Sequence, residues 1–176
     1  MFPPKVRFAF VIICAAVGIY SFTQAQVFPG IALFMVGGLL VYGHISYNRI
    51  ALIYKHAISG DFALAEAQLK KIKNAASLSK EQQAYYHFAK GMVAMNKTAF
   101  EDAGRELSLA IDFGLEKEDD IAVANFYLAK IYFSLSSFVV AREYLDKAMK
   151  YKTHPNLETH IKQMDLVLKQ TRPEDN

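Results

Sequence analysis

The chain has 176 residues, of which 53% are hydrophobic, and a formal net charge of +3. Lys5 and Arg7 are the only charged residues before Arg49, so the rest of the chain has a net charge of +1 and lacks the basic surplus typical of nucleic-acid binding. Cys14 is the only cysteine, which excludes a disulfide framework or a cysteine-based zinc site within one chain.

Residues 1–47 are predicted to form a transmembrane hairpin. No charged residue occurs from Phe8 to Asn48, a stretch about twice the roughly 20 residues that a helix needs to cross a bilayer. Two glutamines and a Pro-Gly pair interrupt this stretch near its middle, so we expect two spans, residues 8–23 and 30–47. A hydrophobic hairpin buried in a soluble core is the alternative, and it is disfavoured because neither run has a polar face.

Basic residues near the ends of the two spans predict their orientation. Lys5 and Arg7 precede the first span, Arg49 and Lys55 follow the second, and the connecting turn contains no basic residue. Because basic residues are retained on the cytoplasmic side, we expect an integral membrane protein with both termini in the cytoplasm. The second span has no helix breaker before Ser59, so it is expected to continue into the first helix of the next domain.

Residues 48–170 are predicted to form an all-α domain of three repeated helix pairs. Small and apolar residues recur at a spacing of 38 residues, which is typical of stacked helical pairs. We expect the repeats at 48–79, 80–117 and 118–154, a capping helix at 155–170 and a disordered tail at 171–176. The recurring positions, which are expected to pack the helices together, are Phe62, Phe100 and Phe138; Ala65, Ala103 and Ala141; Leu69, Leu107 and Leu145; and Ile72, Ala110 and Ala148.

Local signals predict several helix ends within this domain. Ser79 and Gln82 have the spacing of a capping box, and Gly114 is suited to end a helix. The acidic run Glu116–Asp120 is expected to be a solvated helix start, with recruitment of a basic partner as the weaker alternative. The final helix should cover the last pair through apolar residues on one face, namely Leu157, Ile161, Met164 and Leu168.

The repeat resembles the tetratricopeptide repeat family, and particularly membrane-anchored bacterial proteins with such repeats. The third copy carries the resemblance best, through Leu128-Ala129, Tyr132, Phe138, Ala141, Leu145 and Ala148, and Gly91 fills the glycine position of the second copy. The sequence departs from the family because its period is 38 rather than about 34 residues, and because the leading Trp and the closing Pro are missing. The resemblance implies an α-solenoid that binds other proteins, and a location in the bacterial inner membrane.

In this family, the first helix of each pair lines a concave groove that binds a partner. The resemblance assigns these positions to Tyr47, Ile50, Tyr54, Ile58, Tyr85, Phe88, Met92, Met95, Val123, Phe126, Lys130 and Phe133. Nearly all are apolar or aromatic, so the expected partner is a helical or extended apolar protein segment, such as one from another membrane protein. On this basis Phe88→Asp with Phe126→Asp should abolish partner capture without unfolding, and charge reversal at Lys130 should matter little.

Two functional classes are compatible with this pattern. One is a membrane-tethered adaptor or scaffold that presents its groove to a partner; the other is a structural or assembly subunit, or a homodimer, whose groove is permanently filled. The final helix could also fill the groove itself. Enzymatic activity, cofactors and metals are not expected, because the histidines are scattered and no nucleophile or phosphate-binding motif is present; the histidines are His44, His56, His87, His154 and His160.

Overall fold

The computed structural model describes residues 31, 35, 36, 38, 49–151 and 153–171, and every regular element among them is a helix. The all-α prediction is therefore confirmed for this part of the chain.

No helix among these residues is long and apolar enough to cross a bilayer. Apart from the isolated positions 31, 35, 36 and 38, the predicted spans at 8–23 and 30–47 lie outside the described residues, as does the predicted tail from residue 172 onward.

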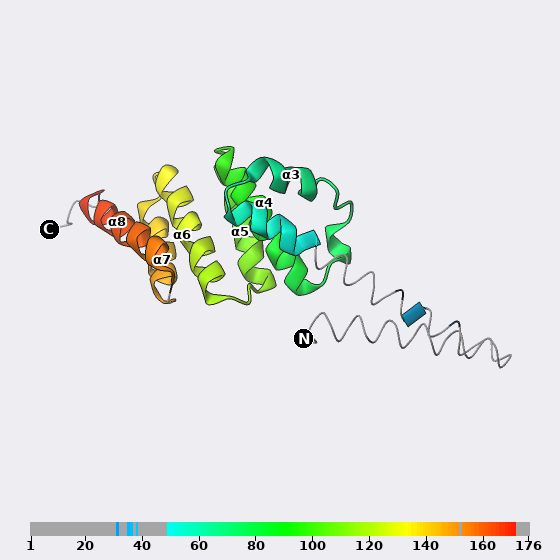
Figure 1. Ribbon diagram of the computed structural model, residues 1–176. Helices are drawn as coiled ribbons and strands as arrows, with labels where there is room; N and C mark the ends of the chain where they lie inside the picture. The colour runs from blue at the N-terminus through cyan, green and yellow to red at the C-terminus, as the bar shows by residue number, and fades with distance from the viewer. Residues whose placement is uncertain (1–30, 32–34, 37, 39–48, 152, 172–176) are drawn as a thin grey trace. The chain divides into compact units, whose positions relative to one another are not determined.

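By its internal contacts the chain divides into two compact units, Met1–Arg49 and Ile50–Asn176, and the second contains the helical domain. Within this unit, consecutive helices lie side by side in chain order, and each packs against the next (Figure 1). After a helical segment at 49–58, the elements are α3 (Phe62–Leu69), the 3₁₀ helix η1 (Ala75–Ser77), α4 (Lys80–Asn96), α5 (Phe100–Phe113), α6 (Glu118–Ser134), α7 (Phe138–Met149) and α8 (Pro155–Thr171).

The turn inside each helix pair has the same backbone conformation in all three copies. Gly60, Thr98 and Ser136 have positive φ angles of 82°, 57° and 59° and are spaced 38 residues apart. The next amide in each turn donates to the carbonyl five residues earlier, a pattern that ends helices in a left-handed residue. These bonds run from Asp61 to His56, from Ala99 to Ala94 and from Ser137 to Tyr132, at 2.9, 3.1 and 2.8 Å. The backbone therefore repeats every 38 residues.

Small side chains allow the helices of each pair to approach closely. Ala65, Ala103 and Ala141 are fully buried, one in each second helix. A Cβ atom on Gly91 of α4 would lie 2.7 Å from Cγ of Leu107 and 3.2 Å from its backbone nitrogen. Because real Cβ contacts are longer than this, α4 and α5 can adopt their spacing only with glycine at position 91.

The helix-end signals in the sequence correspond to formed caps. The Ser79 hydroxyl accepts the Gln82 amide and the Gln82 side chain accepts the Ser79 amide, so the predicted capping box is confirmed. Gly114 ends α5 in a left-handed conformation with φ of 90°. The α3 helix is short, since it ends at Leu69 and η1 begins only after Asn74.

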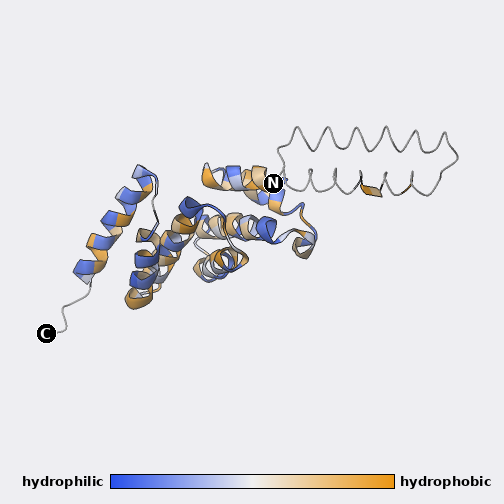
Figure 2. Cartoon of the chain, turned by 90° about the horizontal axis from the view of Figure 1, so that it is seen from below, coloured by the Kyte–Doolittle hydropathy of each residue, from blue (hydrophilic) through white to orange (hydrophobic). Residues whose placement is uncertain are grey.

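Apolar faces of the helices meet in two hydrophobic clusters. The larger cluster joins the segment 49–58 to α3, α4, α5 and α6, and Phe88, Leu107 and Leu128 are fully buried in it. The smaller cluster joins α6, α7 and α8 through residues that include Leu145 and Ile161. Figure 2 shows the corresponding alternation of hydrophobic and hydrophilic residues along these helices. The α8 helix thus covers the last repeat.

Candidate binding site between α6 and α8

The predicted groove residues occupy three different environments rather than one open surface. Ile50, Phe88, Met92 and Phe126 are buried; Tyr54, Tyr85, Met95, Val123 and Phe133 are half-buried; Ile58 and Lys130 are exposed; and Tyr47 lies outside the described residues. Aspartate at Phe88, which is fully buried, would place an unpaired carboxylate in the core, where it is strongly unfavourable. The expectation that Phe88→Asp with Phe126→Asp leaves the fold intact is therefore corrected.

Aromatic side chains of the first two repeats pack against each other. The ring of Tyr54 lies 5.1 Å from that of Tyr85 and 5.8 Å from that of Phe88, measured between centroids. The Tyr54 hydroxyl donates to Oδ1 of Asp120 on α6 at 2.5 Å, and Lys117 lies over the Tyr54 ring. The first repeat therefore contacts the third directly through these side chains.

Asp120 has a role that the sequence interpretation missed. The acidic run at the start of α6 was expected to be solvated, but Asp120 is only 3% exposed, and its Oδ2 atom has no hydrogen-bond partner among the described residues. Burial, followed by the hydrogen bond to this carboxylate, raises the pKa of Tyr54 far above its usual range. A sequence signal existed, since Asp120 precedes the buried Ala124 and Leu128 by four and eight residues on the same helix face.

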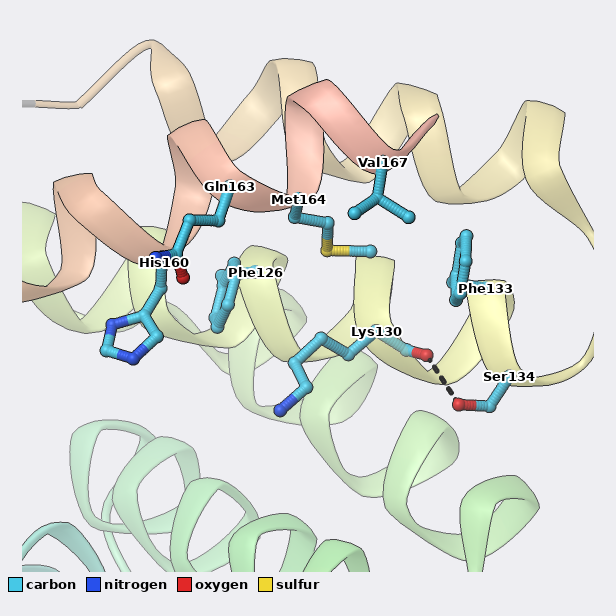
Figure 3. Close-up of a pocket in the computed structure, with 8 residues that line it drawn as sticks. All are labelled: Phe126, Lys130, Phe133, Ser134, His160, Gln163, Met164 and Val167. Carbon is cyan, nitrogen blue, oxygen red and sulfur yellow. Dashed lines mark hydrogen bonds between the residues drawn. The ribbon is translucent and has the colours of Figure 1, made fainter. Parts of the chain in front are cut away.

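An open pocket of about 290 Å³ lies between α6 and α8 (Figure 3). Its walls are mostly apolar, and Met164 projects from α8 into the space between Phe126 and Phe133 of α6 (Figure 3). The residues that line it are Phe126, Lys130, Phe133 and Ser134 from α6, and His160, Gln163, Met164 and Val167 from α8. The structure thus brings together Phe126, Lys130 and Phe133 of the predicted groove and adds a wall from the final helix, whereas Val123 packs against the larger hydrophobic cluster.

Lys130 is the charged group of this pocket. Its ammonium lies 5.8 Å from the ring centroid of Phe126 and 5.4 Å from that of Tyr127, within the range of cation–π attraction. No carboxylate among the described residues pairs with it. The side chain is exposed, so the ammonium is available to a binding partner.

Ion pairs hold α8 beside the third repeat. Arg142 of α7 pairs with Asp165 of α8, which also binds Lys169 at 2.7 Å. The hydrogen bond from Lys169, then that from Arg142, keeps the pKa of Asp165 below its usual range despite the opposing effect of partial burial. The backbone amide of His154 donates to Oδ1 of Asp119, which ties the start of α8 to the start of α6.

A second pocket, of about 470 Å³, is formed by α3, α4 and α5 and is lined by paired charges. Glu106 is 3% exposed and accepts hydrogen bonds from Lys90 at 2.8 Å and from His87 at 2.7 Å. Burial opposes ionisation of Glu106, but these two partners outweigh it and lower its pKa. Glu66 pairs with Lys97 and Lys70, and these hydrogen bonds lower its pKa to about 2. The charges that line this pocket therefore stabilise the contacts among α3, α4 and α5.

Within the part of the chain that the structure describes, no group of three or more His, Cys, Asp or Glu side chains could hold a metal ion. Comparison with known proteins assigns neither a family nor a function to this chain. No protein-family model, curated protein or solved structure matches this chain. The pocket between α6 and α8 is therefore a candidate binding site on the strength of its geometry alone.

Proposed function

We propose that this protein is a membrane-tethered adaptor or scaffold that binds other proteins through a domain of the tetratricopeptide type. The helix-pair turn repeated in three copies and the close approach of two helices at Gly91 support the relationship to this family. The uncharged stretch from Phe8 to Asn48 and the basic residues at its ends support a two-span hairpin in the bacterial inner membrane. Both termini and the helical domain would then be cytoplasmic.

The observation that carries the binding function is the open pocket between α6 and α8. Phe133 and Met164 are only partly buried there, and Val167 is 44% exposed. Apolar side chains gathered around a concavity, with a charged group at its edge, are the usual form of a protein-binding surface.

A structural or assembly subunit is the second candidate function, and the packing of the first two repeats favours it. Phe88 is fully buried, and the hydrogen bond between Tyr54 and Asp120 ties the first repeat to the third. Repeats tied together in this way could act as a fixed spacer in a larger membrane complex or a homodimer. In that case the pocket between α6 and α8 would be permanently occupied by another subunit.

Photocrosslinking in native membranes distinguishes these two functions. A benzophenone amino acid is introduced at Phe133 in the pocket, and, as the control, at Val139, which is 68% exposed on α7 and outside the pocket. An adaptor should crosslink from position 133 and not from 139, and it should purify in mild detergent as a monomer without its partner. A structural subunit should give the same crosslink but elute with a fixed stoichiometry. Absence of any crosslink specific to position 133 would contradict both functions.

A further inference from the structure

The pocket between α6 and α8 contains an unpaired cation on an apolar wall. Lys130 is exposed at the edge of the pocket, and Phe126 and Phe133 lie one turn before and one turn after it on α6 (Figure 3). The second pocket is different, because each of its basic groups already has a carboxylate nearby. There, Lys90 lies 2.8 Å from Glu106, Lys97 lies 2.7 Å from Glu66, and Arg105 lies 2.7 Å from Asp102.

The final helix does not supply the missing anion. Glu158 of α8 pairs with Lys162 at 2.6 Å, and Asp165 is directed to Arg142 and Lys169. The α8 residues that line the pocket are His160, Gln163, Met164 and Val167, none of which carries a negative charge. The apolar walls also weaken the screening of Lys130 by water, so an anion bound there would gain more than at an open surface.

We infer that this pocket selects an acidic amphipathic segment of a partner protein, in which a bulky apolar side chain enters the pocket and a carboxylate one helical turn away pairs with Lys130. This inference rests on the proposed binding function and specifies the chemistry of the partner. The volume of about 290 Å³ lies at the lower end of the range for small-molecule sites, and it suits one or two side chains. Residues three or four positions apart share one face of a helix, which matches the adjacency of the apolar walls and Lys130.

Binding of designed peptides to the full-length protein in mild detergent tests this inference. Three fluorescent helical peptides share the same Leu and Phe positions and differ only in carrying Glu, Gln or Lys one turn from the Phe. The Glu peptide should bind about tenfold more tightly than the Lys peptide, and raising the salt concentration should reduce the difference. Lys130→Glu should reverse the preference, whereas Lys130→Met should remove it and retain binding of the Gln peptide.

Lys147→Glu is the matched control, because Lys147 also lies over an aromatic ring, that of Tyr144 at 4.5 Å, but does not line the pocket. This variant should keep the preference for the Glu peptide. Equal affinities for the three peptides, or a preference that Lys130→Glu leaves unchanged, would overturn the inference. The chain's own tail is also tested, by replacing the acidic residues in its last five positions. If the Glu peptide then bound tenfold more tightly, the tail would be the occupant of the pocket, and the inference would be overturned.

The peptide experiment and the photocrosslinking experiment can fail independently of each other. If position 133 crosslinks to a partner while the peptides show no charge preference, the adaptor function stands and the role of Lys130 is rejected. If position 133 gives no crosslink in native membranes, the adaptor function itself fails, whatever the peptides show. Circular dichroism of Lys130→Glu and Lys130→Met excludes unfolding as the cause of either result.

Discussion

The hydroxyl of Tyr54 donates a hydrogen bond of 2.5 Å to Asp120, a residue 66 positions further along the chain. This bond joins the first helix of the first repeat to the first helix of the third. Tyr54→Phe should lower the free energy of unfolding by about 1–3 kcal/mol, because it leaves the buried carboxylate without its donor. Urea denaturation of Tyr54→Phe, Asp120→Asn and the double variant should give a coupling energy well above zero. Strict additivity would contradict a direct interaction.

The same bond predicts a loss of stability at alkaline pH. The pKa of Tyr54 is raised above its ordinary value of 10.0, so the folded state holds this proton more tightly than the unfolded state does. The stabilisation is fully present below pH 10 and should decline as the pH rises above it. Denaturation midpoints measured from pH 8 to 11 should fall less steeply in Tyr54→Phe than in the wild type.

Gly91 and Gly104 should respond in opposite ways to alanine. A Cβ atom at Gly91 would lie 3.2 Å from the backbone of Leu107, so Gly91→Ala should destabilise the protein by about 1–3 kcal/mol. At Gly104 the nearest atom would lie at 3.8 Å, an ordinary contact, and Gly104→Ala should stabilise α5 by about 0.5–1 kcal/mol. Thermal denaturation of both variants checks this. Equal effects would refute the close approach of α4 and α5.

The repeated turns predict a stabilising substitution. Thr98 is β-branched and has a φ of 57°, a conformation that costs non-glycine residues about 1–2 kcal/mol. Thr98→Gly should therefore raise the free energy of unfolding by up to about 1 kcal/mol, since part of the gain is lost to the greater freedom of the unfolded chain. Gly60→Ala is the reverse control. It has open space for the Cβ atom but a φ of 82°, so it should be destabilised by backbone strain alone.

Glu106 should make the protein sensitive to acid. Its folded-state pKa lies below the ordinary value of 4.5, so its stabilising effect is present above that pH and is lost as the pH falls. Glu106→Gln should be less stable than the wild type by about 1.5–3 kcal/mol at pH 7, and the difference should shrink by pH 3. Urea titrations at both pH values measure this. Glu101→Gln, an exposed change on the same helix, should leave the pH profile unaltered.

The predicted orientation in the membrane can be tested with reporter fusions. A reporter that is active only outside the cytoplasm should work when it is fused after residue 26. A reporter that requires the cytoplasm should work at the C-terminus, because the basic residues Lys5, Arg7, Arg49 and Lys55 all favour cytoplasmic ends. An exported C-terminus would contradict the two-span topology.

Local features of the fold could be predicted from the sequence. The capping box at Ser79, the helix end at Gly114 and the start of α8 at Pro155 depend only on neighbouring residues. The end of α3 at Leu69, by contrast, could not be predicted from neighbouring residues. Its last turn is followed by Lys70 and Lys71, and the amide of Ile72 bonds to the carbonyl of Leu69 only three residues back, which breaks the α-helical pattern.

The candidate site was only partly predictable because it depends on how one repeat is rotated against the next. Family positions identified Phe126, Lys130 and Phe133 but could not reveal that Phe88 is buried. They also could not place α8 opposite Lys130. Apart from Met164, the wall that α8 contributes comes from residues outside its predicted apolar face, namely His160, Gln163 and Val167. The inference drawn for Lys130 differs from the sequence prediction that reversing its charge should matter little, and the peptide experiment distinguishes the two.

The contact between Tyr54 and Asp120 also limits how this protein could change during evolution. Repeat arrays in which each unit touches only its neighbours can gain or lose units, and they can unfold one unit at a time. Here, inserting another unit between the first and third copies would separate the two residues and leave Asp120 buried without a donor. The domain should therefore unfold in a single cooperative step, and its number of repeats should resist duplication.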